Sequence, residues 1–116
     1  MSDLVLELLS GPELPARQWP LVEGLVLGRS ADCALVLPDP GVSRRHAALE
    51  SSGGRLSLRD LGSRAGTYLN DHALDSARPA AIAEHDRIRI GPWRFRVRRS
   101  EAPAARSLPD AVSQGS

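Results

Sequence analysis

Apolar and polar residues alternate one by one in several short runs of this sequence. This period of two restricts those runs to β-strands with one buried face. The clearest case is residues 87–98, RIRIGPWRFRVR, in which arginines alternate with large apolar residues on both sides of Gly91-Pro92. The pattern predicts a β-hairpin with one face in the core and one solvated face rich in arginine.

Further short runs of strand-like composition occur along the chain, separated by turn residues. The expected strands are residues 4–8, 24–27, 34–37, 47–51, 56–58 and 67–69. Many short strands at close spacing are typical of a β-sandwich or barrel. Residues 73–84 have helical composition, but Pro79 interrupts them, and proline inside a helix removes a backbone donor and clashes with the preceding turn. We therefore expect an all-β fold without a helix.

The length and cysteine content fit one domain in a reducing compartment. The chain has 116 residues and a single cysteine, Cys33, which cannot form an internal disulfide; together with the lack of a leader-like start, this predicts a cytoplasmic location. No apolar run is long enough to cross a bilayer. Residues 100–116 lack periodicity and large apolar residues. We therefore expect a domain over residues 1–99 and a flexible C-terminal tail over 100–116.

Charge is distributed unevenly along the chain. The formal net charge is only +1, yet residues 41–99 carry twelve arginines against six acidic residues, and no lysine occurs anywhere. The small net charge argues against a bulk polyelectrolyte binder. Arginine presents a planar fork of donors suited to oxyanions. An anion-binding surface is therefore expected in the middle and late parts of the chain.

Polar residues suited to phosphate lie in the loops between the expected strands. Arg29 follows a strand that ends at Gly28, so its guanidinium would project from a rigid edge and offer parallel donors to a phosphate. Ser43 adds a small hydroxyl donor, and Arg44 and Arg64 add positive charge. Because loops at one end of a sandwich often carry function together, these residues predict a compact dianion pocket.

Four motifs in order resemble those of the forkhead-associated (FHA) domain family. They are LGRS at 27–30, SRRHA at 43–47, DLGSRAGT at 60–67 with Asn70 beyond, and DRIRIG at 86–91. The resemblance implies an antiparallel β-sandwich of about eleven short strands that binds phosphothreonine peptides without catalysis or a cofactor. The implied partner is a protein that an upstream Ser/Thr kinase has phosphorylated on threonine. Nucleic-acid binding and membrane insertion are not expected, and the oligomeric state is left open.

The resemblance also assigns roles to individual residues. Phosphopeptide-binding positions correspond to Arg29, Ser43, Arg44, Ser63, Arg64 and Ala65. Positions that support the binding loops correspond to Gly28, His46, Gly66, Thr67 and Asn70. Arg29 and Ser43 are expected to contact the phosphate, and Arg64 to shape the pocket around the phosphate and the threonine methyl group. His46 is expected to hold the loops by hydrogen bonds.

The sequence departs from the family pattern at three places. The family usually has Asn-Gly-Thr where this chain has Ala65-Gly66-Thr67, so an amide that would bind the peptide backbone is missing. Loss of one such hydrogen bond weakens binding by roughly 0.5–1.5 kcal/mol. The chain also has Asn70-Asp71 in place of Asn-Gly and His85-Asp86 in place of Gly-Asp. Both are expected to affect turns away from the pocket.

Catalytic and metal sites were weighed as alternatives. Ser43, His46 and Asp60 supply the residue types of a hydrolase, but no G-x-S-x-G elbow surrounds the serine. His46, His72 and His85 lack the short ligand spacing of a metal site, and Cys33 has no partner cysteine. We therefore expect neither an enzyme nor a bound metal.

Two binding alternatives use the sheet surface. The arginine row of residues 87–98 could bind nucleic acid or acidic lipid, or it could be a solvated face that also protects a sheet edge from aggregation. The near-zero net charge and the lack of aromatic residues interleaved on that face favour the solvated surface. The second alternative is a phospho-independent scaffold that assembles a larger complex through a sheet face, such as a secretion or signalling complex.

Overall fold

The computed structural model describes residues 4–100. These residues form eleven strands and no helix. The strands are β1 (Leu4–Ser10), β2 (Gln18–Pro20), β3 (Val26–Gly28), β4 (Leu35–Val36), β5 (Ala47–Ser52), β6 (Arg55–Asp60), β7 (Thr67–Leu69), β8 (His72–Ala73), β9 (Ala80–Ala81), β10 (Arg87–Ile90) and β11 (Trp93–Arg99).

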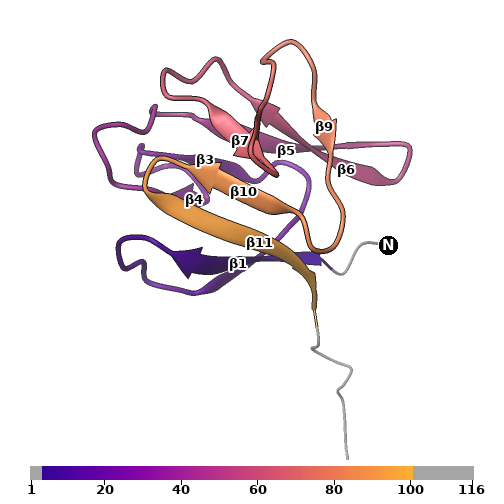
Figure 1. The fold of residues 1–116 in the computed structure, drawn as a ribbon, viewed down its shortest axis with the longest axis horizontal. Helices are drawn as coiled ribbons and strands as arrows, with labels where there is room; N and C mark the ends of the chain where they lie inside the picture. The colour runs from indigo at the N-terminus through magenta and orange to yellow at the C-terminus, as the bar shows by residue number, and fades with distance from the viewer. Residues whose placement is uncertain (1–3, 101–116) are drawn as a thin grey trace, which may run out of the picture.

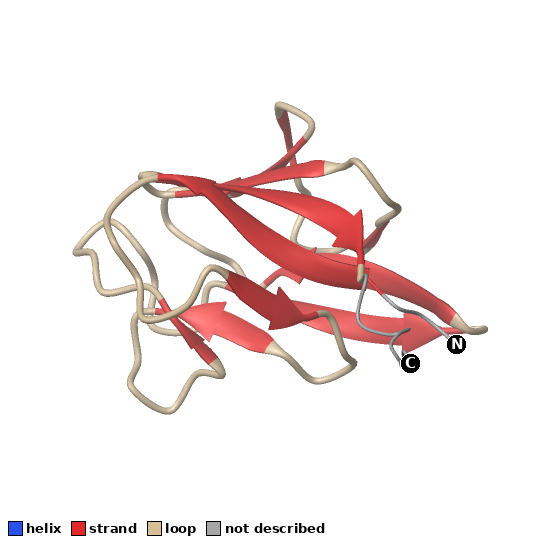
Figure 2. Ribbon diagram, turned by 90° about the horizontal axis from the view of Figure 1, so that it is seen from below, coloured by secondary structure: helices blue, strands red, loops and turns tan. Residues whose placement is uncertain are grey.

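The strands are arranged in two facing sheets, which Figure 2 shows as two layers. The six-stranded sheet has the order β2-β1-β11-β10-β7-β8, and the five-stranded sheet has the order β4-β3-β5-β6-β9. All neighbouring strands are antiparallel except β3 and β4, which are parallel. The all-β sandwich of about eleven strands expected from the sequence is therefore confirmed.

The core lies between the sheets and is built from the apolar residues of the alternating runs. From β10 and β11, Ile88, Ile90, Trp93, Phe95 and Val97 are all at most 2% exposed. The facing sheet contributes Leu27, Leu35, Ala47, Leu49 and Leu58. Burying a large apolar side chain stabilises the fold by about 1.5–3 kcal/mol. This shared core fixes the strands that carry the loops described below.

The predicted hairpin of residues 87–98 is confirmed as β10 and β11, joined at Gly91-Pro92. Its position corrects one expectation. β11 lies between β1 and β10, and β10 lies between β11 and β7. The arginine-rich face therefore belongs to the interior of a sheet, and it does not protect an edge from pairing.

Sequence patterns located the longer strands better than the short ones. The expected strands at 24–27 and 34–37 are observed at Val26–Gly28 and Leu35–Val36. Three strands of two or three residues, β2, β8 and β9, were not predicted, because so short a run shows no alternation. The tail expected over residues 100–116 lies outside the described residues except for Ser100. Within residues 4–100, no helix is long and apolar enough to cross a membrane.

The two ends of the sandwich differ (Figure 1). At one end, Ile90 pairs with both Trp93 and Thr67, so the Gly91-Pro92 turn lies beside the loop that precedes β7. β11 runs away from this turn, and the antiparallel β1 runs beside it in the opposite direction, so Leu4 lies opposite Arg99. The start of the first strand and the end of the last strand therefore meet at the end of the sandwich away from the β6–β7 loop.

Candidate anion-binding site

Three loops meet at one end of the sandwich and form an open cavity of about 450 Å³. They are the loops β3–β4, β4–β5 and β6–β7, at residues 29–34, 37–46 and 61–66. Four arginines line the cavity together with Ser43, and they are Arg29, Arg44, Arg45 and Arg64. No acidic residue is in the lining. All four arginine side chains are exposed. The cavity is therefore suited to an anion that carries more than one negative charge.

Arg29 is anchored by the neighbouring loop. Its backbone N–H donates to the Ser43 carbonyl at 2.9 Å, and its Nε donates to the Val42 carbonyl at 3.0 Å. These two bonds fix the backbone and the inner part of the guanidinium. The terminal nitrogens remain at the exposed cavity wall, where they can donate to a ligand.

Gly28 allows the close approach of the two loops that carry Arg29 and Arg44. A Cβ atom at residue 28 would lie 2.1 Å from the Arg44 carbonyl oxygen, which is far inside any van der Waals contact. The backbone of Arg44 also accepts a hydrogen bond from the Ser30 N–H at 3.1 Å. Only glycine at residue 28 permits this packing.

Ser43 is held at both its backbone and its side chain. Its N–H donates to His46 Nδ1 at 3.1 Å, and its Oγ accepts from the Arg64 N–H at 3.1 Å. A hydroxyl that accepts one bond still has its own hydrogen to donate. Ser43 can therefore donate to an oxyanion in the cavity while it links the β4–β5 loop to the β6–β7 loop.

His46 joins the two loops from inside the protein. It is 0% exposed, and its Nε2 donates to the Gly66 carbonyl at 2.8 Å while its Nδ1 accepts from Ser43. Because one ring nitrogen donates and the other accepts, the partners fix a neutral tautomer. Both nitrogens are used by backbone groups. His46 is therefore not arranged as a base for the Ser43 hydroxyl.

Asp60 organises the β6–β7 loop from the end of β6. This 5%-exposed carboxylate accepts from the hydroxyls of Ser63 and Thr67, and from the N–H groups of Gly62 and Ser63 at 3.1 and 3.0 Å. Burial raises the pKa of Asp60, but these four donors outweigh it, so the net pKa lies below the usual 3.8. Asp60 thus keeps its charge for the loop, and it is not hydrogen-bonded to His46 as a hydrolase triad would require.

The structure brings together only some of the residues singled out from the sequence. Arg29, Ser43, Arg44 and Arg64 line the cavity. The Ser63 hydroxyl instead points into the loop, where it donates to Asp60 and accepts from the Gly66 N–H at 3.0 Å. Ser63 therefore stabilises the loop in the structure, although the sequence placed it among the ligand contacts.

Ala65, Thr67 and Asn70 also lie off the cavity lining. Ala65 is exposed in the β6–β7 loop, and Thr67 is buried against Asp60. Asn70 does not contact the binding loops. It accepts from the Arg87 N–H at 2.9 Å and donates to Asp86 at 3.1 Å, which ties the β7–β8 turn to the start of β10.

Two features of the site were missed by sequence analysis. Arg45 lines the cavity and lies 3.8 Å from the exposed Asp32 carboxylate; its place beside Arg44 in the motif was the available signal. Asp60 was considered only for a triad, and its role depends on contacts that the sequence pattern does not display. Within residues 4–100, no group of three or more His, Cys, Asp or Glu is placed to hold a metal ion.

The chain matches the model of the FHA domain family over residues 25–91. This chain belongs to the FHA family. It is 42% identical to the glycogen accumulation regulator GarA of Mycolicibacterium smegmatis over 68 residues, which are 59% of this chain and 41% of that protein. The chain thus corresponds to about two fifths of this relative's length.

Two solved structures of FHA proteins have a similar fold. One comes from work on phosphothreonine-dependent FHA domain interactions, with 33% identity, a TM-score of 0.70, and coverage of 85% of this chain and 98% of that one. The other is Mycobacterium tuberculosis EmbR in complex with a low-affinity phosphopeptide, with 25% identity, a TM-score of 0.75, and coverage of 88% and 26%.

Proposed function

We propose that this FHA domain is a non-catalytic module that binds a phosphothreonine on a partner protein in Ser/Thr kinase signalling. The observation that carries the proposal is the cavity at the loop end, with four arginines, one pre-oriented hydroxyl and no acidic residue in its lining. A phosphorylated threonine carries close to two negative charges and three acceptor oxygens. Its chemistry matches that lining.

Binding would replace the water shell of the phosphate with charge-assisted hydrogen bonds. Arg29 would donate through its terminal nitrogens, and Ser43 would donate through its hydroxyl. Each hydrogen bond to a charged group contributes about 1.5–3 kcal/mol. Because His46, Ser43 and Arg64 already link the loops, little backbone ordering remains to be done on binding.

Apolar groups in the cavity lining support threonine over serine. Leu61 lines the cavity beside the arginines and is 39% exposed, whereas Val42, also in the lining, is only 1% exposed, so Leu61 supplies the apolar surface. The γ-methyl group of phosphothreonine could pack on such a surface, whereas phosphoserine has no group to place there. Burial of one methyl group is worth roughly 0.8 kcal/mol, so the preference would be several-fold.

Ala65 distinguishes recognition of the phosphate from recognition of the peptide. The residue is exposed in the β6–β7 loop but has no side-chain amide to bind a peptide backbone. The cavity still has three arginines besides Arg29, namely Arg44, Arg45 and Arg64. Their attraction to a phosphate does not depend on a hydrogen bond to the peptide backbone. Affinity would therefore depend mainly on the phosphate and on the residues that flank it. The unpaired, buried Cys33 is compatible with action in the cytoplasm.

The relatives support the same function. One similar structure comes from work on phosphothreonine-dependent FHA interactions, and another holds a phosphopeptide. The proposal implies a protein kinase upstream, because phosphothreonine is formed by transfer of a phosphoryl group to a threonine hydroxyl. Buried His46 has both ring nitrogens engaged by backbone groups, which supports binding without catalysis.

The test is a titration with a degenerate peptide library in three forms, carrying threonine, phosphothreonine or phosphoserine. Wild type should bind the phosphothreonine form, and Arg29→Ala should weaken this binding by at least about 100-fold through the loss of two charge-assisted hydrogen bonds. Arg55→Ala, which removes an exposed arginine on β6, is the matched control and should bind as wild type does. Equal binding of modified and unmodified peptides would overturn the proposal in favour of a phospho-independent scaffold.

A further inference from the structure

A second group of arginines lies on the outer face of the six-stranded sheet, away from the anion-binding cavity. It alternates with the core residues of β10 and β11. We call it the basic sheet face, and its members are Arg87, Arg89, Arg94, Arg96 and Arg98. Because the two strands are adjacent and central in the sheet, the five arginines form a compact patch on regular backbone.

The strand register places arginines directly opposite one another. Arg87 pairs with Arg96, and Arg89 pairs with Arg94. Like charges at directly opposite positions of an antiparallel pair are destabilising. Protection of a sheet edge would be one reason to keep them, but β10 and β11 have neighbours on both sides. The arrangement calls for an anion that neutralises it.

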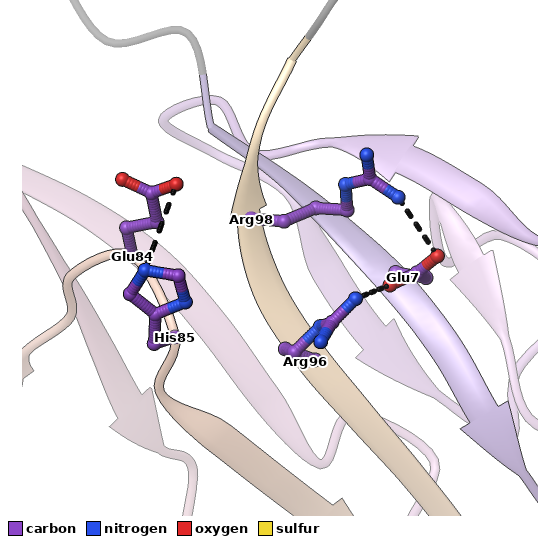
Figure 3. A network of polar contacts seen from close by, with 5 residues as sticks. All are labelled: Glu7, Glu84, His85, Arg96 and Arg98. Carbon is purple, nitrogen blue, oxygen red and sulfur yellow. Dashed lines mark hydrogen bonds and ion pairs between the residues drawn. The ribbon is translucent and has the colours of Figure 1, made fainter.

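Part of this need is met by Glu7 on the neighbouring strand β1 (Figure 3). One carboxylate oxygen of Glu7 accepts from Arg96 Nη2 at 2.8 Å, and the other accepts from Arg98 Nη1 at 3.0 Å. The Arg96 hydrogen bond is the main reason that the pKa of Glu7 lies below its usual value. Glu7 shows that a carboxylate on an extended chain fits between arginines two residues apart.

The other half of the patch has no such carboxylate. Among the described residues, no ion pair reaches Arg87, Arg89 or Arg94. Arg89 lies over the Tyr68 ring, 4.0 Å from its centroid. The three arginines, Tyr68 and Asp71 line a hollow of about 90 Å³. In the described part of the chain, Asp71 makes no ion pair with these arginines.

A further carboxylate near the patch, that of Glu84, already has partners. Glu84 lies 3.8 Å from His85 Nε2, as Figure 3 shows, and 3.6 Å from Arg99 Nε. These residues border a second hollow of about 310 Å³ beside Arg96 and Arg98. The basic sheet face thus carries two neighbouring hollows and more arginines than its own carboxylates pair with.

We propose that the basic sheet face docks an acidic polypeptide segment that lies across it in extended form, with Asp or Glu at alternate positions. Charge complementarity selects the occupant, and Glu7 provides the internal example of the contact. An extended chain rises about 3.4 Å per residue, so side chains on one side of it repeat every ~6.8 Å. The arginines along β11 have the same spacing, because they occupy alternate positions. The surface is separate from the phosphate cavity and would bind without phosphorylation.

Polypeptide fits better than nucleic acid. Single-stranded nucleic acids bind through aromatic side chains on which bases stack. Two aromatic residues line these hollows, but Phe95 is 0% exposed and the Tyr68 ring is covered by Arg89. The net charge of the whole chain is also only +1, which gives little long-range attraction for a polyanion.

The test uses two unphosphorylated peptides of equal composition. One has glutamate at alternate positions separated by serine, and the other has its glutamates in one block. Binding is measured by fluorescence anisotropy, and backbone amide shifts locate it. The double variant Arg87→Gln/Arg94→Gln is compared with Arg55→Gln/Arg78→Gln, which removes the same charge from exposed arginines outside the patch. Arg29→Ala, single-stranded DNA and vesicles of anionic phospholipid complete the set.

The alternating peptide should bind several-fold more tightly than the blocked one and shift amides of β10 and β11. Arg87→Gln/Arg94→Gln should weaken it by about tenfold, while the control pair and Arg29→Ala leave it unchanged. Equal weakening by both double variants, or loss with Arg29→Ala, would overturn the proposal. The proposal would also be overturned if the domain bound DNA or vesicles but not the alternating peptide. The same holds if the domain self-associates in analytical ultracentrifugation and Arg87→Gln/Arg94→Gln abolishes this self-association.

Discussion

The chain holds two groups of arginines, and they are positioned by different means. Those of the anion-binding cavity lie on loops, and their places depend on buried polar side chains, chiefly His46 and Asp60. Those of the basic sheet face lie on β10 and β11, where the backbone ladder and strand register place them. A loop site is therefore sensitive to single buried residues, whereas a sheet site can lose a side chain and keep its geometry.

The charges that accompany the two groups differ in the same way. Asp60 is buried and bonded to neutral donors, and salt screens such a group little. Glu7 is 21% exposed and bonded to two arginines at the surface, so dissolved salt competes with its partners. Substitution of each carboxylate by its amide breaks one of the two arrangements.

The largest effect is expected for Asp60→Asn. The amide would turn an NH₂ group toward donors that Asp60 accepts from, so at least one buried donor loses its partner, at a cost of about 2 kcal/mol in the free energy of unfolding. The β6–β7 loop would loosen, and binding of the phosphothreonine peptide would fall with it. Chemical denaturation and the peptide titration measure the two losses.

The pH dependence of the free energy of unfolding tests whether the Asp60 charge causes this loss of stability. Because the folded-state pKa of Asp60 lies below its usual 3.8, its contribution to stability is fully present above about pH 5 and is lost as the pH falls through the lowered value. The gap between wild type and Asp60→Asn should therefore narrow in acid. Asp75→Asn, which alters an exposed carboxylate that accepts from the Ala77 N–H, is the control. Equal stability of Asp60→Asn and wild type at neutral pH would contradict the assigned role.

A smaller loss is expected for Glu7→Gln. Removing the carboxylate breaks its ion pairs with Arg96 and Arg98, at a cost of about 0.5–1 kcal/mol at low salt, typical of partly exposed pairs. The difference from wild type should shrink when denaturation is repeated at high salt, whereas that of Asp60→Asn should persist. A salt-independent loss for Glu7→Gln would show that the two carboxylates act alike and would remove the contrast.

The smallest effect, and a gain, is expected for His85→Gly. His85 has φ +81°, a left-handed conformation that costs a residue with a Cβ atom about 1 kcal/mol, only partly offset by the flexibility of glycine when unfolded. The free energy of unfolding should rise by about 0.5 kcal/mol. His72→Gly, in β8, is the control and should be destabilising. A loss for His85→Gly would show that its contact with Glu84 outweighs the backbone strain.

The fold could be predicted where alternation runs over several residues. Residues 87–98 specify both the hairpin and its buried face, because only a period of two buries Trp93, Phe95 and Val97 together. The position of that hairpin in the sheet could not be predicted in the same way. Whether a strand is central or at an edge depends on pairing with β1 and β7, which are distant in sequence.

The site could be predicted as far as its motifs carry ligand-facing groups. Arg29, Ser43, Arg44 and Arg64 line one cavity, as the motifs had placed them near one ligand. The direction of a hydroxyl depends on what surrounds it, so Ser63 was assigned to the ligand although it donates to Asp60. Asp60 itself acts through four donors that come together only when the loop closes.

The pairing of Leu4 with Arg99 means that the domain has one attachment end and one working end. A host protein, a solid support or a fluorescent fusion joined directly at Leu4 or Arg99 would sit away from the cavity. Because the two ends are Cα partners in neighbouring strands, a short linker could join them, and new ends could be opened at the exposed Ser52-Gly53-Gly54 turn. Such a circular permutant should keep the arrangement of its binding loops.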